Sequence, residues 1–304
     1  MADPTRLNPV DRWMGFANLA FLASWLPLTP ESSLARWLVL VHLAGLLVPW
    51  LLLRRTRPLS PFGSALHDGY PLLWTAVFWN EFGLRHDLTA TALNDPIVAG
   101  WDLAVFGGHW NVLWVSAMPW PGLSELLQGA YFSYYLMLAA IPVALIAGRE
   151  PGIRRDIVLR IAATYLGCFL IYSYFPVIGP RELWPTHQGA LTEGLFYQIN
   201  AALRSAGDSL GTAFPSSHTA GAVTFAWIAW LYAPRALAWL IASLAVLIAA
   251  ATVYTQNHFA IDTLAGVVVA GFMQAIVVPF LTARRPLTLG LPPVPTPGQL
   301  PKTA

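Results

Sequence analysis

Two short strings, Phe214-Pro215-Ser216-Ser217-His218 and His258-Phe259-Ala260-Ile261-Asp262, each lie where a long apolar segment meets a polar loop. The first string leads into the apolar run 218–233, and the second opens the apolar run 259–282. Strand-like alternation of apolar and polar residues is absent from both runs, so the expected elements are helices. The strings therefore predict an all-α protein whose polar chemistry gathers at helix ends.

Composition points to a membrane protein. Of the 304 residues, 56% are hydrophobic and only 11% are charged, against about 25% charged in ordinary soluble domains. A soluble protein of this composition would expose apolar patches well above the usual size. The single cysteine excludes a disulfide within the chain. The net charge of +2 is small and scattered, so no nucleic-acid partner is expected.

The apolar runs predict a polytopic helical bundle with about eight spans. A helix needs about 20 residues to cross a bilayer, or about 17 at the short end. The stretch 65–84 is the weakest candidate, because it contains Asp68, Asn80 and Glu81. The predicted spans are 13–28, 37–53, 65–84, 123–147, 157–178, 218–233, 236–254 and 259–282.

The basic residues predict the orientation of the bundle. With eight spans and both termini cytoplasmic, 13 of the 17 lysines and arginines fall on the cytoplasmic side and 4 on the other. Cytoplasmic loops carry such an excess. If 65–84 did not cross, three arginines would change sides and the asymmetry would weaken. The four on the outer side are Arg36, Arg85, Arg181 and Arg204.

Three regions are expected along the chain. Residues 1–122 form N-terminal spans and an outer interfacial loop, 123–285 form a catalytic membrane core, and 286–304 form a disordered tail rich in proline. The outer loops, 85–122 and 179–214, are long. In the first of them, Asp95 and Asp102 are expected to cap helices, with binding of a polar headgroup as the lesser alternative.

Span counting places both strings on the same, outer membrane face, where they offer the groups for phosphoryl transfer. His258 and Asp262 are four residues apart, so they are neighbours on one helical face. A carboxylate bonded to one ring nitrogen fixes the tautomer and leaves the other nitrogen free to attack phosphorus. His218 can then protonate the leaving oxygen as a general acid.

A phosphate-binding site is expected beside these histidines. Pro215 in the first turn and Ser216 as the cap favour a helix start, whose free N–H groups and positive dipole end attract an anion. Arg181, after the run 157–178, can clamp phosphate oxygens. Three side chains, His218, His258 and Asp262, would also suit a metal, but the neighbouring arginine favours an anion. No metal and no cofactor are therefore expected.

Several other polar residues are expected to be structural. Tyr131, Tyr134 and Tyr135 lie within the span 123–147 and are expected to pack there, with lining the site as the lesser alternative. The remaining histidines are expected to be interfacial or structural: His42, His67, His86, His109 and His187.

The two strings resemble signatures of the type 2 phosphatidic acid phosphatase superfamily, over about residues 120–282. The signature Pro-Ser-Gly-His is similar to residues 215–218, with Ser217 in place of glycine, and His-x3-Asp matches His258 and Asp262. In this replacement of glycine by Ser217, the chain resembles the branch of the superfamily that holds the inositol phosphorylceramide synthases. The resemblance implies His258 as nucleophile, Asp262 as its orienter and His218 as acid and then base. It also implies that Ser216 and the backbone near Ser217 hold phosphate.

The chain departs from the superfamily pattern at two cations. In the signature Lys-x6-Arg-Pro only Arg181 matches, because Tyr174 occupies the lysine position, and Thr252 stands where an arginine usually precedes the histidine. A phosphomonoester carries nearly two negative charges and a diester only one. Fewer cations favour a diester, and hence transfer of a phosphoryl-containing headgroup between a lipid and an alcohol acceptor.

Two alternatives stay open. One is a lipid phosphate phosphatase that hydrolyses a monoester with water as the acceptor. The other is a membrane transporter or scaffold, although transporters place ionisable residues near the bilayer midplane and not at span ends.

Overall fold

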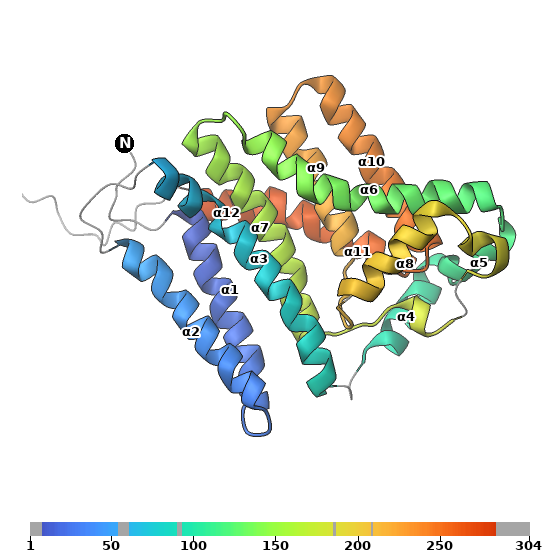
Figure 1. The fold of residues 1–304 in the computed structure, drawn as a ribbon, viewed down its shortest axis with the longest axis horizontal. Coiled ribbons are helices and arrows are strands. Elements are labelled where there is room, and N and C mark those ends of the chain that lie inside the picture. The colour runs from blue at the N-terminus through green and yellow to red at the C-terminus, as the bar shows by residue number, and fades with distance from the viewer. Residues whose placement is uncertain (1–7, 54–60, 90–92, 185–186, 208, 284–304) are drawn as a thin grey trace, which may run out of the picture.

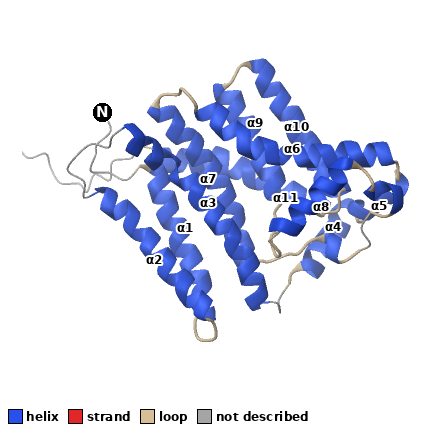
Figure 2. Ribbon diagram, viewed as in Figure 1, coloured by secondary structure: helices blue, strands red, loops and turns tan. Residues whose placement is uncertain are grey.

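The computed structural model describes residues 8–53, 61–89, 93–184, 187–207 and 209–283. Within these ranges every regular element is a helix, and the only extended pairing is one isolated bridge between Val177 and Thr212. Figure 2 shows helices joined by loops, with no strand, throughout the described chain. The predicted all-α class is confirmed.

The N-terminal part consists of three long helices that lie side by side (Figure 1). They are α1 (Pro9–Trp25), α2 (Ser33–Leu53) and α3 (Pro61–Thr89). Asn8 begins α1 through a capping box with Asp11, in which the side chain of each residue accepts from the backbone N–H of the other. The weak candidate 65–84 is thus the middle of one continuous helix, which packs along the seventh helix of the chain.

The C-terminal part is built around α7 (Pro151–Tyr174). In this helix 78% of the most apolar window is buried, against 39% or less in the other long apolar helices, so α7 forms the centre of the bundle. Against it pack α6 (Pro121–Ile146), α9 (Ser217–Tyr232) and α11 (Ala260–Phe272), which continues through a π-helical turn into α12 (Val278–Thr282). Helix α10 (Arg235–Tyr254) packs on α9 and α6.

A glycine allows α9 and α11 to meet closely. A Cβ atom at Gly266 in α11 would lie 2.5 Å from the backbone oxygen of Ser216, which precedes α9. A larger residue would therefore push the two helix starts apart. This contact brings the two signature strings next to each other.

Four helices are long and apolar enough to cross a membrane among the described residues: α6, α7, α10 and the α11–α12 unit. This is compatible with an integral membrane protein, and large apolar side chains such as Val143, Val246 and Phe280 are strongly exposed on the helix surfaces. The count of eight spans is not reached on length and composition. One reason is that α9 has only 16 residues.

The two long loops contain helices that the apolar runs did not predict. The loop 85–122 holds α4 (Asp95–Phe106) and α5 (Trp110–Ala117), and the loop 179–214 holds α8 (Leu195–Gly207). Local signals define α4: Pro96 stands in its first turn, and Gly107 ends it at φ 69°. The predicted tail 286–304 lies outside the described residues.

Candidate active site

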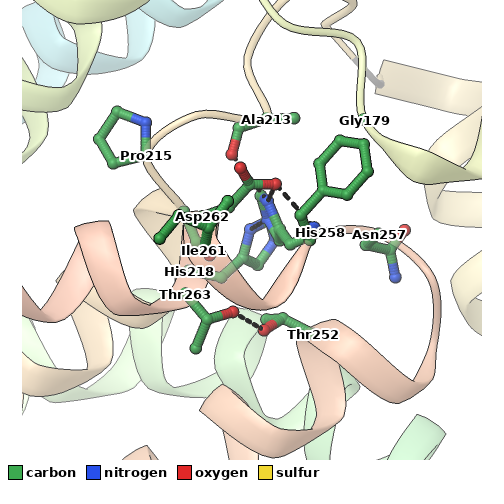
Figure 3. A network of polar contacts seen from close by, with 12 residues as sticks. Gly179, Ala213, Pro215, His218, Thr252, Asn257, His258, Ile261, Asp262 and Thr263 are labelled. Carbon is green, nitrogen blue, oxygen red and sulfur yellow. Dashed lines mark hydrogen bonds and ion pairs between the residues drawn. The ribbon is translucent and has the colours of Figure 1, made fainter. Parts of the chain in front are cut away.

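The loop after α7 and the loop before α9 are joined by backbone hydrogen bonds. Val177 N donates to Gly211 O at 3.2 Å, and Ala213 N donates to Val177 O at 2.8 Å. Gly179 follows at φ 105°, and a Cβ there would lie 3.0 Å from Ala213 Cβ and 3.1 Å from Asn257 O. Only glycine suits this position. Three loops distant in the sequence therefore meet at one end of the bundle (Figure 3).

His258 is held at the centre of this junction. Its Nδ1 lies 2.8 Å from the backbone oxygen of Ala213 and 3.6 Å from Asp262 Oδ2. A carbonyl oxygen only accepts, so Nδ1 carries the proton and Nε2 keeps its lone pair. The ring is buried. The geometry thus presents one ring nitrogen of His258 as a nucleophile.

The contact between His258 and Asp262 differs from the simple helical pair that the spacing predicts. His258 precedes the first turn of α11, whose N-cap is Phe259, and Asp262 Oδ2 accepts from Phe259 N at 2.8 Å. The closer partner of the imidazole is the carbonyl of Ala213, which no pattern in the sequence predicts. The carboxylate of Asp262 is buried and lies 3.6 Å from His258 Nδ1, too far for a hydrogen bond but close enough for an electrostatic interaction with the ring.

His218 lies in the first turn of α9 and faces His258. The distance from His218 Nδ1 to His258 Nε2 is 3.4 Å, and His218 Nε2 lies 3.0 Å from Tyr131 Oη. Since His258 Nε2 has the lone pair, neutral His218 donates to it from Nδ1 and accepts from Tyr131 at Nε2. The tyrosine hydroxyl, both imidazoles and the Ala213 carbonyl therefore form one directed chain of hydrogen bonds.

The tyrosines of α6 surround His218 and do more than pack within the helix. The ring centroids of Tyr131 and Tyr134 lie 4.8 and 4.4 Å from that of His218, and Tyr135 lies 6.0 Å away. These tyrosines line the cavity into which His218 points. Tyr131 and Tyr134 thus pack in the core, as expected, and the three tyrosines also line the cavity beside His218.

The start of α9 is formed by Ser216, as the sequence predicts. Its Oγ accepts from Thr219 N at 3.3 Å, and its N–H donates to Asp262 O at 2.9 Å. Pro215 precedes this cap and is not part of the first turn, which corrects the prediction. Ser217 N donates to Tyr172 Oη at 3.2 Å. A phosphate group that binds at this helix start therefore competes with Tyr172 Oη and Ser216 Oγ for the backbone N–H groups of Ser217 and Thr219.

Arg181 lies beside the histidines. Its Nη1 donates to Asn257 Oδ1 at 2.8 Å, and Asn257 directly precedes His258. Its Nε is 3.6 Å from a carboxylate oxygen of Glu182, which is half exposed. The structure thus brings Arg181, Ser216, Ser217, His218, His258 and Asp262 to one end of the bundle.

The two positions that lack a cation point elsewhere. Tyr174 is 60% exposed, and its hydroxyl donates to Ala20 O in α1 at 2.8 Å. Thr252 is fully buried, and its Oγ1 lies 2.9 Å from Thr263 Oγ1 (Figure 3). Neither residue supplies positive charge to the site.

Two buried aspartates of α4 hold the site from behind. Asp95 accepts from Ile178 N at 3.0 Å and from Gly179 N at 2.8 Å. Asp102 accepts from Ile261 N at 3.0 Å. Asp95 therefore caps the loop that carries Arg181, and Asp102 caps the first turn of α11, next to His258. Both are positioning residues.

Replacing Asp95 by alanine is expected to lower the stability of the protein and the activity of the site together. Each lost charge-assisted bond costs about 1.5–3 kcal/mol, and a displacement of Arg181 by about 1 Å costs about 100-fold in rate. Asp95→Asn, which keeps one acceptor oxygen, should give an intermediate loss. Thermal unfolding in detergent and steady-state kinetics measure the two effects. Full activity of Asp95→Ala would contradict the positioning role.

His187 lies in the loop before α8 and packs against Tyr254, with ring centroids 5.3 Å apart. Burial lowers the pKa of His187 to about 4, so it is neutral at pH 7. It makes no contact with His218 or His258 that would assign it to the reaction. In the described part of the chain, no three His, Cys, Asp or Glu side chains are grouped to hold a metal ion.

Fold and site together define an α-helical protein with membrane-length helices, at whose ends two histidines face each other near Arg181. The model of the PAP2 superfamily matches residues 101–276, which is more than half of the chain, and the chain belongs to this superfamily. Members are generally phosphatases or phosphotransferases, and lipid phosphates are the expected substrates. No curated protein and no solved structure matches the chain.

The superfamily resemblance is thus confirmed. The matched segment contains every predicted site residue. It begins in α4, so α1, α2 and α3 lie outside it.

Proposed function

We propose that this protein transfers a phosphoryl-containing headgroup from or to a lipid through a phosphohistidine intermediate, without a metal. The observation that carries the proposal is the facing pair of imidazoles. His258 presents Nε2 with its lone pair, and Nδ1 of His218 lies 3.4 Å away, where a protonated His218 can act as the general acid. An arginine and two helix starts, those of α9 and α11, add positive potential at the same place.

The steps follow from the geometry. A substrate phosphate enters between the two imidazoles, and its oxygens lie against Arg181 and the start of α9. Nε2 of His258 bonds to phosphorus and the bond to the leaving oxygen breaks. His218, which carries a proton on both ring nitrogens once the anionic substrate is bound, gives one of them to that oxygen and becomes neutral. His218 then takes a proton from an acceptor hydroxyl, which attacks phosphorus and releases His258.

The His258 ring needs little reorganisation during these steps. When Nε2 becomes bonded to phosphorus, the ring gains positive charge, and its Nδ1–H already points at the Ala213 carbonyl with Asp262 behind it. Such pre-oriented dipoles stabilise charge at no reorganisation cost.

The charge of the site favours a diester donor. Tyr174 and Thr252 stand where the superfamily pattern has cations, and neither supplies positive charge. Of the three cation positions in that pattern, Arg181 is the one that is kept, and it bonds to Asn257 beside His258. One guanidinium matches the single charge of a diester better than the nearly double charge of a monoester. The inositol phosphorylceramide synthase-like branch, to which Ser217 points, suggests inositol phosphate as the transferred group and a lipid alcohol as the acceptor.

A glycerophospholipid diester is therefore expected to turn over about ten-fold faster or more than phosphatidic acid, and transfer should exceed hydrolysis when an alcohol acceptor is present. Headgroup-labelled phosphatidylinositol and labelled phosphatidic acid, supplied in mixed micelles with and without a long-chain alcohol, measure both ratios. A preference for phosphatidic acid with water as the effective acceptor would contradict the transferase proposal.

One observation favours the phosphatase alternative. Arg204 of α8 lines the same cavity as Ser217 and His218, so it could supply a second cation to a monoester. Arg204→Gln separates the two activities. A phosphatase should lose turnover of phosphatidic acid, whereas diester transfer at Arg181 should change within about two-fold.

The same site geometry argues against a transporter, because the ionisable groups lie at helix ends. On the distribution of lysines and arginines, we place the site on the outer membrane face, with both termini in the cytoplasm.

A further inference from the structure

A cavity of about 540 Å³ begins at the site and runs away from it along the helices. At one end it is lined by Ser217, His218 and Arg204. Most of its remaining lining is aliphatic or aromatic and comes from α3, α6 and α7. Its volume lies in the range of small-molecule sites, about 300–1,000 Å³.

The cavity is elongated. On α6 its lining extends from Tyr131 to Val143, a rise of about 18 Å. On α3 it extends from Leu72 to Asn80, about 12 Å. One leaflet contributes about half of the 30 Å hydrocarbon core of a bilayer. The cavity therefore has the length of one hydrocarbon chain within one leaflet.

The arrangement of the helices leaves a lateral opening. The helices α3 and α6 each pack on α7 but not closely on each other, so the cavity lies between them over α7. Val143 at the far end is 68% exposed, and Leu138 is 40% exposed. These residues lie in a membrane-length helix, so the far end faces the lipid phase.

We propose that this cavity binds the hydrocarbon chain of the lipid substrate while the phosphate lies at His218, and that α3 sets the accepted chain length. That the bound lipid is a substrate rests on the proposed function, but binding of the hydrocarbon chain can be measured without turnover. Helix α3 is outside the segment that matches the superfamily, so this wall is a feature of the N-terminal helices of this chain.

The test uses the full chain in phosphatidylcholine nanodiscs and a single-chain alkyl phosphate with a diazirine at mid-chain. Ala76→Trp and Ala139→Trp fill the cavity from α3 and from α6. Leu73→Trp and Ala140→Trp are matched controls, because these exposed neighbours on the same helices lie outside the lining. Mass spectrometry locates the cross-links, and kinetics compare sixteen-carbon with six-carbon alkyl phosphates.

Cross-links are expected between Leu72 and Asn80 and between Leu138 and Val143, and both cavity-filling variants should reduce them about ten-fold. The same variants should lower turnover of the long chain about ten-fold and change the short chain within about two-fold, whereas the controls change neither. Cross-links spread evenly over lipid-facing helices, unaffected by either tryptophan, would overturn the proposal. Cross-links at the expected places in a protein that turns over neither the alkyl phosphates nor phosphatidylinositol would reject the proposed function alone.

Discussion

Replacing His258 by asparagine is expected to lower the rate of phosphoryl transfer by at least about 10⁴-fold, because it removes the atom that bonds to phosphorus. The asparagine amide can still donate to the Ala213 carbonyl in the place of Nδ1. Local structure should therefore persist, and the loss can be assigned to Nε2. Turnover of labelled lipid and thermal unfolding in detergent measure the two properties.

The covalent intermediate gives a second readout for the same residue. After a rapid alkaline quench, peptide mass spectrometry should find phosphate on His258 in the wild type and none in His258→Asn. His67→Gln is the control, because His67 bonds to Asp11 in the N-terminal helices and should leave turnover unchanged. Phosphate found on His218 instead would reverse the two roles.

Replacing His218 by glutamine is expected to lower turnover of a lipid phosphate by about 10²–10⁴-fold, because glutamine cannot give its proton to the leaving oxygen. The amide can still contact Tyr131 in the place of Nε2. An aryl phosphate, whose leaving group needs no proton, should phosphorylate His258 at nearly the wild-type rate in this variant.

That difference between leaving groups identifies the acid. In His218→Gln the phosphoenzyme formed from the aryl phosphate should accumulate, since the base for the second step is also missing. An equal loss with both leaving groups would show that His218 positions His258 or the phosphate and transfers no proton.

The helices followed from local signals in the sequence. Apolar runs of sufficient length set the long helices, and Ser216 marked the start of α9 as its cap. Capping depends on residues within about one turn, so it can be predicted without the fold. The short helices α4, α5 and α8 were missed because a search for membrane-length runs overlooks segments of 8 to 13 residues.

The candidate catalytic residues were also accessible from the sequence, because their chemistry depends on residue type and spacing. His218, His258 and Arg181 each stand at the end of an apolar run, and the parity of the runs places such ends on one face. The contacts that orient them were not accessible in the same way. Asp95 and Asp102 could be suspected only as polar residues in an aromatic loop.

Only the tertiary structure decided which partners complete the site. Every residue has a backbone carbonyl, so the identity of residue 213 does not announce its contact with His258. That contact forms because Gly179 lets the loops approach closely. Tyr131 contacts His218, and α3 forms one wall of the cavity, because of the way whole helices pack on α7. Helix propensity and capping act within a few residues of the chain. Packing of whole helices depends on the shape of every surface that meets, and that information is not local.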